Sequence, residues 1–264
     1  MAVSGDGDRW ALINCAPEVL SQIRVTHELH PRNGLRGSPI DSVLLTNGDI
    51  DHVAGLLSLR EGQPFRLLAT AAILDVLRAS SAFDVLGEGT VSRCAVELGA
   101  RFDLVEGVAA TIFPVPGKVA LYLEAREQTA TGTLDTEIEG EQTIGIELTA
   151  GGKRALFIPG CAAITPALAA RIEGADVLLF DGTLWLDDEM IREGVGTKTG
   201  RRMGHMSMYG VEGSIAQLAR LEIGRRIFVH INNTNPVLIE GSEERLSAER
   251  AGWEIAEDSM EITL

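Results

Sequence analysis

Side chains that can bind a metal ion are concentrated directly after one apolar segment of the chain. Residues 43–45 have the character of a buried strand, and the sequence NGDIDH follows at positions 47–52, before an apolar helical pattern. Open α/β sheets place their ligands at the carboxyl ends of strands. Asp51 and His52 can therefore reach one ion if the backbone turns there, and Asp49 is a further candidate ligand. The alternative is a polar turn with an aspartate helix cap.

Two later segments carry further candidate histidines. His230 comes near the end of the apolar run RRIFVH, and His205 comes just before a predicted helix. Taken singly, a strand histidine is more often a hydrogen-bonded core residue, and His205 could lie at the surface. However, three of the five histidines, His52 included, fall where strands end, so we expect these three to lie together. His27 and His30 are instead expected at a helix C-terminus.

The surrounding chain alternates short apolar runs with segments of helical period. We expect strands over residues 10–14, 42–46, 65–70, 154–158, 176–180 and 226–231. We expect helices over residues 18–27, 52–60, 71–79, 166–173 and 209–221. The stretch 94–149 is expected to form a β-meander that includes 118–125, with an exposed hairpin or loop over 124–143. Two sheets packed face to face, with helices outside, accommodate both patterns in one α/β domain.

Composition limits the class of protein. The formal net charge of −15 at pH 7 excludes a general nucleic-acid binder, which needs a cationic surface. No apolar run approaches the length of a membrane span, and residues 1–10 lack the cationic and apolar regions of a secretory signal. The three cysteines, Cys15, Cys94 and Cys161, are far apart and form no CxxC pair, so no disulfide framework is expected. These features predict a cytoplasmic protein without membrane insertion.

Taken in order, these segments resemble the metallo-β-lactamase superfamily. Its signature is a strand followed by His-x-His-x-Asp-His, then a later histidine, a bridging aspartate and a final histidine. Here Asn47 and Asp49 replace the two leading histidines, and the later histidine is replaced near residues 116–118. The bridging aspartate would fall at about Gly160 and is also missing. The positions that match the signature are Asp51, His52 and His230.

A narrower resemblance covers nearly the whole chain. The strings TNGDIDHVAGLLSLREGQPF, GLRGSPI, ALFIPGC, LLFDGTLW and GHMSMYGVEGSI are similar to the pyrroloquinoline quinone (PQQ) biosynthesis protein B family. The resemblance implies an αββα sandwich of two mixed sheets, as a single domain over residues 1–264. Family members usually begin with about forty further residues that include a first strand and a cysteine-rich structural zinc site. This sequence starts after that segment, either because the start is truncated or because this member lacks it, so no structural zinc is carried over. Without that strand, we expect residues 10–14 near a sheet edge with unpaired backbone groups.

The matching residues form a single-metal ligand set. Two histidines and one carboxylate are the facial triad of non-haem Fe(II) oxygenases, and Zn2+ accepts the same three ligands plus water. The resemblance favours Fe2+ and implies a hydroxylase that acts on a precursor made from cross-linked glutamate and tyrosine. Asp51, His52 and His230 are therefore the predicted metal ligands, with Asp49 as a further candidate.

Two other side chains are predicted to take part in the chemistry. His205 is placed beside the metal as a general acid/base or substrate-binding group, because an imidazole titrates near neutral pH. Asp181, at the end of a predicted strand, is expected to orient His52 or His230. The alternative for Asp181 is a helix or turn cap.

Cationic side chains are the candidates for recognising the precursor. The glycine-rich loop 193–204 contains Lys198, Arg201 and Arg202, and arginine recognises carboxylates well. Asn47 is a further candidate substrate-binding residue. The alternative for this loop is an ordinary solvated segment.

Two other functions compete with the oxygenase. One is a non-catalytic carrier that binds PQQ or its precursor and assists transport to the periplasm. The other is a residual metallo-hydrolase, which the missing first-site histidines disfavour. For both the oxygenase and the carrier, the expected partner is the small-molecule precursor or PQQ. A homodimer is a candidate assembly.

Overall fold

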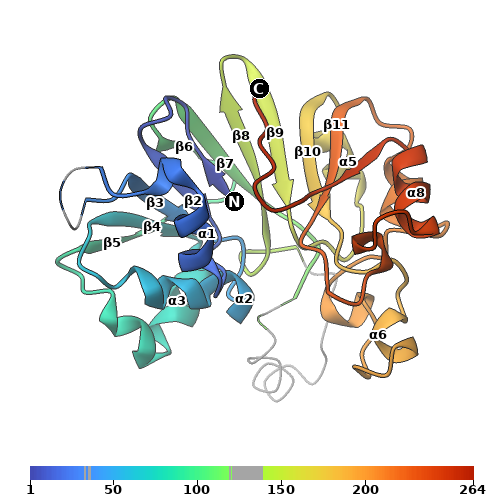
Figure 1. Ribbon diagram of the computed structural model, residues 1–264, viewed down its shortest axis with the longest axis horizontal. Helices are drawn as coiled ribbons and strands as arrows, with labels where there is room; N and C mark the ends of the chain where they lie inside the picture. The colour runs from blue at the N-terminus through green and yellow to red at the C-terminus, as the bar shows by residue number, and fades with distance from the viewer. Residues whose placement is uncertain (33, 35–36, 119, 121–138) are drawn as a thin grey trace.

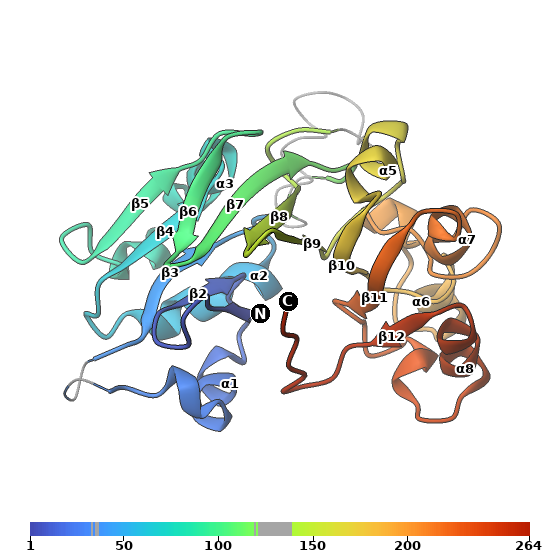
Figure 2. The same cartoon turned by 90° about the horizontal axis from the view of Figure 1, so that it is seen from above.

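The computed structural model describes residues 1–32, 34, 37–118, 120 and 139–264, whose strands form two sheets (Figures 1 and 2). The five-stranded sheet has the order β1-β2-β3-β4-β5. Strands β2 to β5 are parallel, and β1 is antiparallel to β2. The strands are β1 (Ala2–Val3), β2 (Trp10–Ile13), β3 (Ile40–Leu44), β4 (Phe65–Ala69) and β5 (Val91–Ala95).

The seven-stranded sheet has the order β12-β11-β10-β9-β8-β7-β6. Its half from β9 to β12 is parallel, whereas its half from β6 to β9 is antiparallel. The strands are β6 (Arg101–Val105), β7 (Val108–Pro114), β8 (Ile144–Ala150), β9 (Lys153–Ile158), β10 (Ala175–Asp181), β11 (Ile223–Val229) and β12 (Trp253–Ile255).

Helices connect the parallel strands. The α-helices are α1 (Val19–Val25), α2 (Ile50–Val53), α3 (Ala71–Arg78), α5 (Pro166–Ile172), α6 (Glu189–Arg192), α7 (Ser214–Leu218) and α8 (Glu243–Arg250). The 3₁₀ segments are η1 (His27–Leu29), η2 (Ala54–Leu59), η3 (Ser81–Val85), η5 (Arg201–Met203) and η6 (Pro236–Leu238). Within the described residues, none of these helices has the length and apolar character that crossing a bilayer requires.

Alternating side chains bury both faces of each sheet. On β3, Leu44 packs into the core between the sheets, whereas Val43 packs into the core beneath α1 and α3. On β10, Leu179 faces the central core, and Leu178 faces the core beneath α5, α7 and α8. Figure 2 shows α5, α7 and α8 along the outer side of β9 to β12. Three apolar layers therefore separate four layers of structure, which confirms the expected αββα sandwich.

Most predicted elements are present, but some boundaries differ and several elements were missed. The predicted helix 209–221 is wrong over its first half, because Gly210 takes a left-handed φ of 100° and α7 begins only at Ser214. Strands β1 and β12 and helices α6 and α8 were not predicted. Helix α8 buries only Ala248 and so lacks an apolar stripe. The predicted strand 118–125 lies almost entirely outside the described residues.

Strand β2 is not an edge strand. It pairs with β3 on one side and with β1 on the other, where Ala2 lies opposite Leu12 and Val3 opposite Ala11. The backbone of Met1 also exchanges hydrogen bonds with Ile13. The expected unpaired edge at residues 10–14 is therefore wrong, because the first three residues of the chain cover it.

A close backbone contact fixes the segment that carries His52. The N–H of Gly55 donates to the carbonyl of Cys15 at 2.9 Å, and the N–H of Cys15 donates to the carbonyl of His52 at 2.7 Å. A Cβ on Gly55 would lie 2.1 Å from the Ala16 carbonyl oxygen. We expect Gly55→Ala to lower the free energy of unfolding by about 1–3 kcal/mol or more. Gly87→Ala is the control, since its Cβ would meet nothing within 4 Å.

The two glycine variants are compared by thermal unfolding. At about 2–4 °C per kcal/mol for a chain of this size, Gly55→Ala should lower the melting temperature by several degrees. Gly87→Ala should leave it unchanged or slightly raised, because alanine restricts the unfolded chain. Equal melting temperatures for both variants would show that the contact between Gly55 and Ala16 does not hold this segment.

Candidate metal centre

The residues of the candidate centre lie at the carboxyl ends of parallel strands in both sheets. Asn14 follows β2, residues 46–52 follow β3, Gly160 follows β9, Asp181 ends β10 and His230 follows β11. Helix α2 marks this edge of the sandwich at the bottom of Figure 1. The two sheets thus bring residues that are distant in the sequence to one edge, as ligand sites of open α/β sheets require.

The three predicted metal ligands lie together. One ligand atom each from Asp51, His52 and His230 fall within 4.8 Å of one another. The Oδ2 atom of Asp51 lies 3.1 Å from Nε2 of His230 and 3.6 Å from Nε2 of His52. The two imidazole rings meet edge to face, with centroids 5.0 Å apart. This arrangement of two imidazoles and one carboxylate can hold one metal ion. The side chain of Asp51, which supplies the carboxylate, is 59% exposed.

The charge states of these side chains suit metal binding. Burial, with the nearby charge of His230, lowers the pKa of His52 to about 3, so this imidazole is neutral at neutral pH. Desolvation works to raise the pKa of Asp51, but the hydrogen bond from His230 and the electrostatic interactions with the two histidines outweigh it and lower the pKa. Burial would lower the pKa of His230, but Asp51, Asp181 and Asp49 raise it overall. Binding a cation at His230 would therefore release a proton.

A neutral polar network holds His52 from behind. Its Nδ1 lies 3.3 Å from the hydroxyl of Thr46. The backbone N–H of Thr46 donates to Oδ1 of Asn14 at 2.8 Å, and the amide of Asn14 donates to the Thr46 hydroxyl at 2.8 Å. Asn14 has a left-handed φ of 58°, a conformation that asparagine tolerates better than most residues. These contacts leave Nε2 of His52 to face Asp51.

A charged network holds His230. Its Nδ1 lies 2.8 Å from the hydroxyl of Thr183, which donates to Oδ1 of Asp181 at 2.6 Å. Oδ2 of Asp181 lies 2.7 Å from Nδ1 of His205 and accepts from the backbone N–H of Cys161 at 3.0 Å. Because Nδ1 of both imidazoles is engaged, we assign the proton of each ring in its neutral form to Nδ1. Nε2 of each ring is then the ligand or base atom.

Asp181 is fully buried and anionic. Burial would raise its pKa, but the charges of His205 and His230 and the hydrogen bonds from His205 and Thr183 outweigh burial and lower the pKa. Of the two histidines that Asp181 was predicted to orient, the carboxylate lies near His230. It contacts Nδ1 of His205 at 2.7 Å, and it reaches His230 both through Thr183 and directly, with its Oδ1 4.0 Å from Nδ1 of His230.

His205 lies against His230 rather than apart from it. The two rings stack with centroids 5.3 Å apart and an angle of 17° between their planes. Asp181, His205 and His230 also have ligand atoms within 4.8 Å of one another, so His205 borders the centre as predicted. A Cβ on Gly160 would lie 3.5 Å from Cε1 of His205. The ring of His205 thus fills the space beside the position expected for the bridging aspartate.

Asn47 and Asp49 lie in the turn between β3 and α2, and each makes a specific contact. Asn47 is buried, and its Oδ1 accepts the backbone N–H of Asp49 at 2.9 Å, which tightens the turn before α2. This contact gives Asn47 a structural role in the turn. Asp49 is absent from both groups of candidate ligand atoms in the described residues, and its Oδ2 lies 3.8 Å from Nζ of Lys118.

The predicted cationic loop leads into His205. Residues Arg201–Met203 form η5, and the backbone N–H of Arg201 donates to the Asp187 carboxylate at 2.8 Å. The N–H of His205 donates to the carbonyl of Gly200 at 2.9 Å, so the loop closes just before the histidine. Lys198, Arg201 and Arg202 therefore lie on the segment that delivers His205 to the centre.

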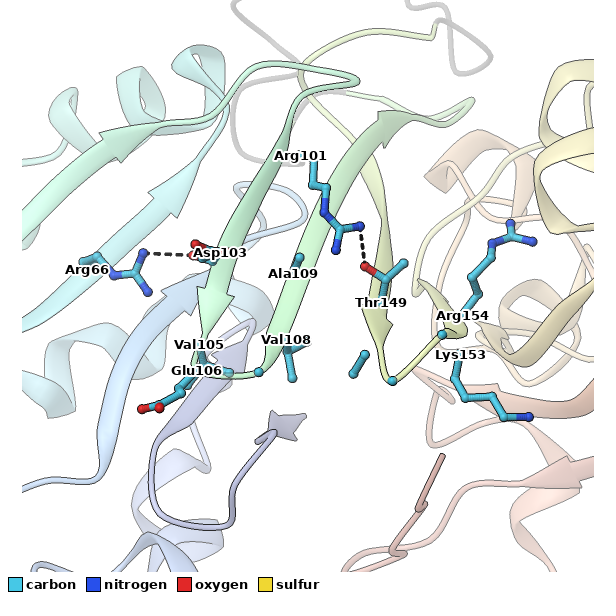
Figure 3. Close-up of a pocket in the computed structure, with 14 residues that line it drawn as sticks. Arg66, Arg101, Asp103, Val105, Glu106, Val108, Ala109, Thr149, Lys153 and Arg154 are labelled. Atoms are coloured by element: carbon cyan, nitrogen blue, oxygen red, sulfur yellow. Dashed lines mark hydrogen bonds between the residues drawn. The ribbon is translucent and has the colours of Figure 1, made fainter.

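A large surface cavity lies elsewhere. It has a volume of about 640 Å³ and is lined by the β6–β7 and β8–β9 turns, with Arg66, Arg101, Lys153 and Arg154 among its residues (Figure 3). It lies at the amino end of β9, opposite the edge that carries the histidines. Three of its cations already contact carboxylates. We therefore assign the cavity no part in the chemistry.

Sequence reasoning missed three residues that the structure places at the site. Thr183 joins two histidines to Asp181, Asn14 supports the Thr46–His52 contact, and Lys118 lies beside Asp49. Thr183 and Asn14 share the signal that revealed the histidines, since each directly follows a parallel strand. Lys118 follows the antiparallel strand β7. The only sequence signal for this residue was its position near a replaced histidine of the signature.

Comparison with known proteins decides the family. A model of the beta-lactamase superfamily domain matches residues 9–231. Coenzyme PQQ synthesis protein B from Methylobacterium radiotolerans is 55% identical over 100% of this chain and 86% of its own. The chain belongs to the coenzyme PQQ synthesis protein B family. The protein of that name from Ruegeria pomeroyi is 50% identical over 100% of this chain and 87% of its own.

Solved structures agree with this family. The Zn2+-bound PqqB from Methylobacterium extorquens matches with a TM-score of 0.95 and 56% identity, over 100% of this chain and 86% of that chain. The metallo-β-lactamase fold protein YhfI from Bacillus subtilis matches with a TM-score of 0.64 at 14% identity, over 97% and 88% of the two chains. The first confirms the predicted family, and the second shows the fold alone.

Proposed function

We propose that the chain is a metal-dependent enzyme of PQQ biosynthesis that uses dioxygen to hydroxylate a precursor made from cross-linked glutamate and tyrosine. The observation that carries the proposal is the convergence of Asp51, His52 and His230 in a chain of this family. Two imidazoles and one carboxylate form the ligand set of non-haem Fe(II) oxygenases, which leaves positions open for oxygen and substrate.

The residues present fit such an ion. His52 is neutral, both of the ligand histidines have Nδ1 held by a threonine, and Asp51 is anionic. A bound Fe2+ would supply one-electron chemistry toward dioxygen at its open positions. Zn2+ accepts the same ligands, and a relative has been solved with Zn2+. The preference for Fe2+ is thus part of the proposal.

His205 is assigned the proton transfers. Its Nδ1–H donates to Asp181 at 2.7 Å, so Nε2 is the nitrogen that can accept a proton from the substrate. The buried carboxylate of Asp181 then stabilises the imidazolium and fixes the direction of its ring. This is the role of an aspartate behind a catalytic histidine.

Arg201 and Arg202 are proposed to bind carboxylates of the precursor. Either Arg→Ala change should weaken precursor binding by about ten- to a hundredfold, because a charge-assisted hydrogen bond contributes roughly 1.5–3 kcal/mol. The metal content should not change, since neither guanidinium is a ligand. Arg220→Ala, an exposed arginine beyond α7, is the control. Titration of metal-loaded protein with precursor measures the effect, and unchanged affinity in both variants would remove these residues from the substrate site.

The proposal is tested by oxygen uptake. The protein is reconstituted anaerobically with Fe2+, and oxygen consumption is measured with and without the diamino acid precursor. Ascorbate is present in both assays to supply the two electrons that reduce the second oxygen atom of dioxygen to water. We expect uptake that depends on both iron and precursor. Tight binding of precursor or PQQ without uptake would favour a carrier instead.

A further inference from the structure

Lys118 is a buried cation beside the candidate metal centre. Its side chain is only 7% exposed, and its Nζ lies 3.8 Å from Oδ2 of Asp49. Lysine is almost never buried this far without a partner of opposite charge. The ammonium group is therefore held as a fixed positive charge inside a protein of net charge −15.

The surrounding backbone fixes the course of this side chain. The hydroxyl of Thr143 donates to the carbonyl of Lys118 at 2.9 Å. A Cβ on Gly117 would lie 2.7 Å from Thr143, and a Cβ on Gly204 would lie 3.2 Å from Cγ of Lys118. Glycine at both positions thus lets the chain pack closely on either side of the lysine. The aliphatic stem of Lys118 packs against Gly204, where a Cβ would crowd it.

The ammonium group therefore lies between two loops of the candidate metal centre, the β3–α2 loop and the loop that carries His205. Asp49 precedes the ligand Asp51 by two residues, and Gly204 directly precedes His205. Asp49 is also near enough to His230 to raise its pKa. Lys118 therefore lies where the β3–α2 loop and the loop of His205 approach each other.

Lys118 lies near a position at which the metallo-β-lactamase signature has a histidine. The replaced histidines of the signature fall at Asn47, at Asp49 and near residues 116–118. Asp49 and Lys118, from two of these positions, form an ion pair. A positive charge is thus present among the residues that would otherwise surround a cation.

We propose that the ammonium of Lys118 is an anion-binding group of the site and receives a carboxylate of the substrate beside its ion-pair partner Asp49. The identity of the substrate class rests on the proposed function. An ammonium has three donors, so it can serve Asp49 and a substrate oxygen together. Asp49 and Asp51 would otherwise repel an anionic substrate, and this cation offsets part of their charge.

PQQ, a tricarboxylate, is the probe, and its neutral trimethyl ester is the comparison ligand. Binding is measured on the Zn2+-loaded protein, because Zn2+ has no redox chemistry. Lys118→Met should weaken PQQ binding by about ten- to a hundredfold and leave affinity for the ester nearly unchanged. Zinc content should remain as in the unaltered chain. Lys153→Met is the matched control, because Lys153 is 53% exposed and pairs with Asp176 at 2.8 Å away from the site.

The difference between the two ligands separates recognition from structure. A merely structural lysine would change binding of acid and ester equally, and that result would overturn the proposal. Unchanged binding of both would overturn it too. If Lys118→Met melts too early to measure, Asp49→Asn decides, because it keeps the ammonium and removes its competing carboxylate. PQQ binding should then hold or tighten, and a selective loss of PQQ binding would contradict the proposal.

These outcomes are independent of oxygen chemistry. Selective loss of PQQ binding in Lys118→Met, without oxygen uptake by the iron-loaded protein, would refute the proposed oxygenase and retain the anion site. Oxygen uptake with unaltered PQQ binding in Lys118→Met would do the reverse.

Discussion

His52→Ala should lose its metal ion and nearly all turnover. His52 is one of only three proposed protein ligands, and alanine leaves Asp51 and His230 to hold the ion alone. Loss of an outer-shell partner costs roughly 10–100-fold in metal affinity or activity, so loss of a ligand should cost more. Elemental analysis and precursor-dependent oxygen uptake measure the two effects.

His27→Ala is the control for this change. His27 is exposed, and its ring lies beside that of His30. It is not among the residues of the candidate metal centre. Its replacement should alter neither metal content nor oxygen uptake. A carrier would show a different pattern, in which His52→Ala binds and delivers its ligand normally. Full activity of His52→Ala with the metal absent would refute the oxygenase.

Asp181→Asn should be the second most damaging change. All four groups that contact this carboxylate are donors, namely the N–H groups of Cys161 and Thr183, the hydroxyl of Thr183 and Nδ1 of His205. An asparagine NH2 would face donors whichever way it turned, which costs about 1–3 kcal/mol of stability. We also expect metal affinity to fall by roughly 10–100-fold, because His230 loses the carboxylate behind Thr183.

Asp176→Asn is the matched control on the same strand. Asp176 contacts Lys153 and the backbone of Arg154 at the amino end of β10, away from the histidines. Its replacement should leave metal affinity unchanged. Metal titrations on both variants, with melting temperatures, separate the two effects. Equal metal affinity in both would show that Asp181 does not support the ligand histidines.

The sequence predicts the positions of the candidate ligands because they follow apolar runs whose period identifies strands. His52 and His230 lie 178 residues apart, yet both follow a parallel strand, and parallel strands end at the same edge. The fold followed from the same pattern, since residues such as Val43 and Leu44 alternate between two apolar layers.

The missed contacts depend on geometry that no periodicity encodes. Thr183 reaches two histidines because His230 adopts a left-handed φ of 55°, which turns the chain back at the end of β11. The burial of Lys118 depends on Gly204, which is distant in sequence. The helix predicted over residues 209–221 began too early. The apolar residues keep a helical spacing across Gly210, but the φ of 100° at this glycine is incompatible with a right-handed helix.

The most direct test of the central claim is the origin of the oxygen atoms in the product. Iron-loaded protein is given the diamino acid precursor under 18O2 in ordinary water, and the product is analysed by mass spectrometry. A parallel reaction uses ordinary dioxygen in H2(18)O and corrects for exchange. We predict that label enters the product from 18O2 and that His52→Ala yields none. Product that takes its new oxygen only from water, or precursor recovered unchanged, would contradict the account.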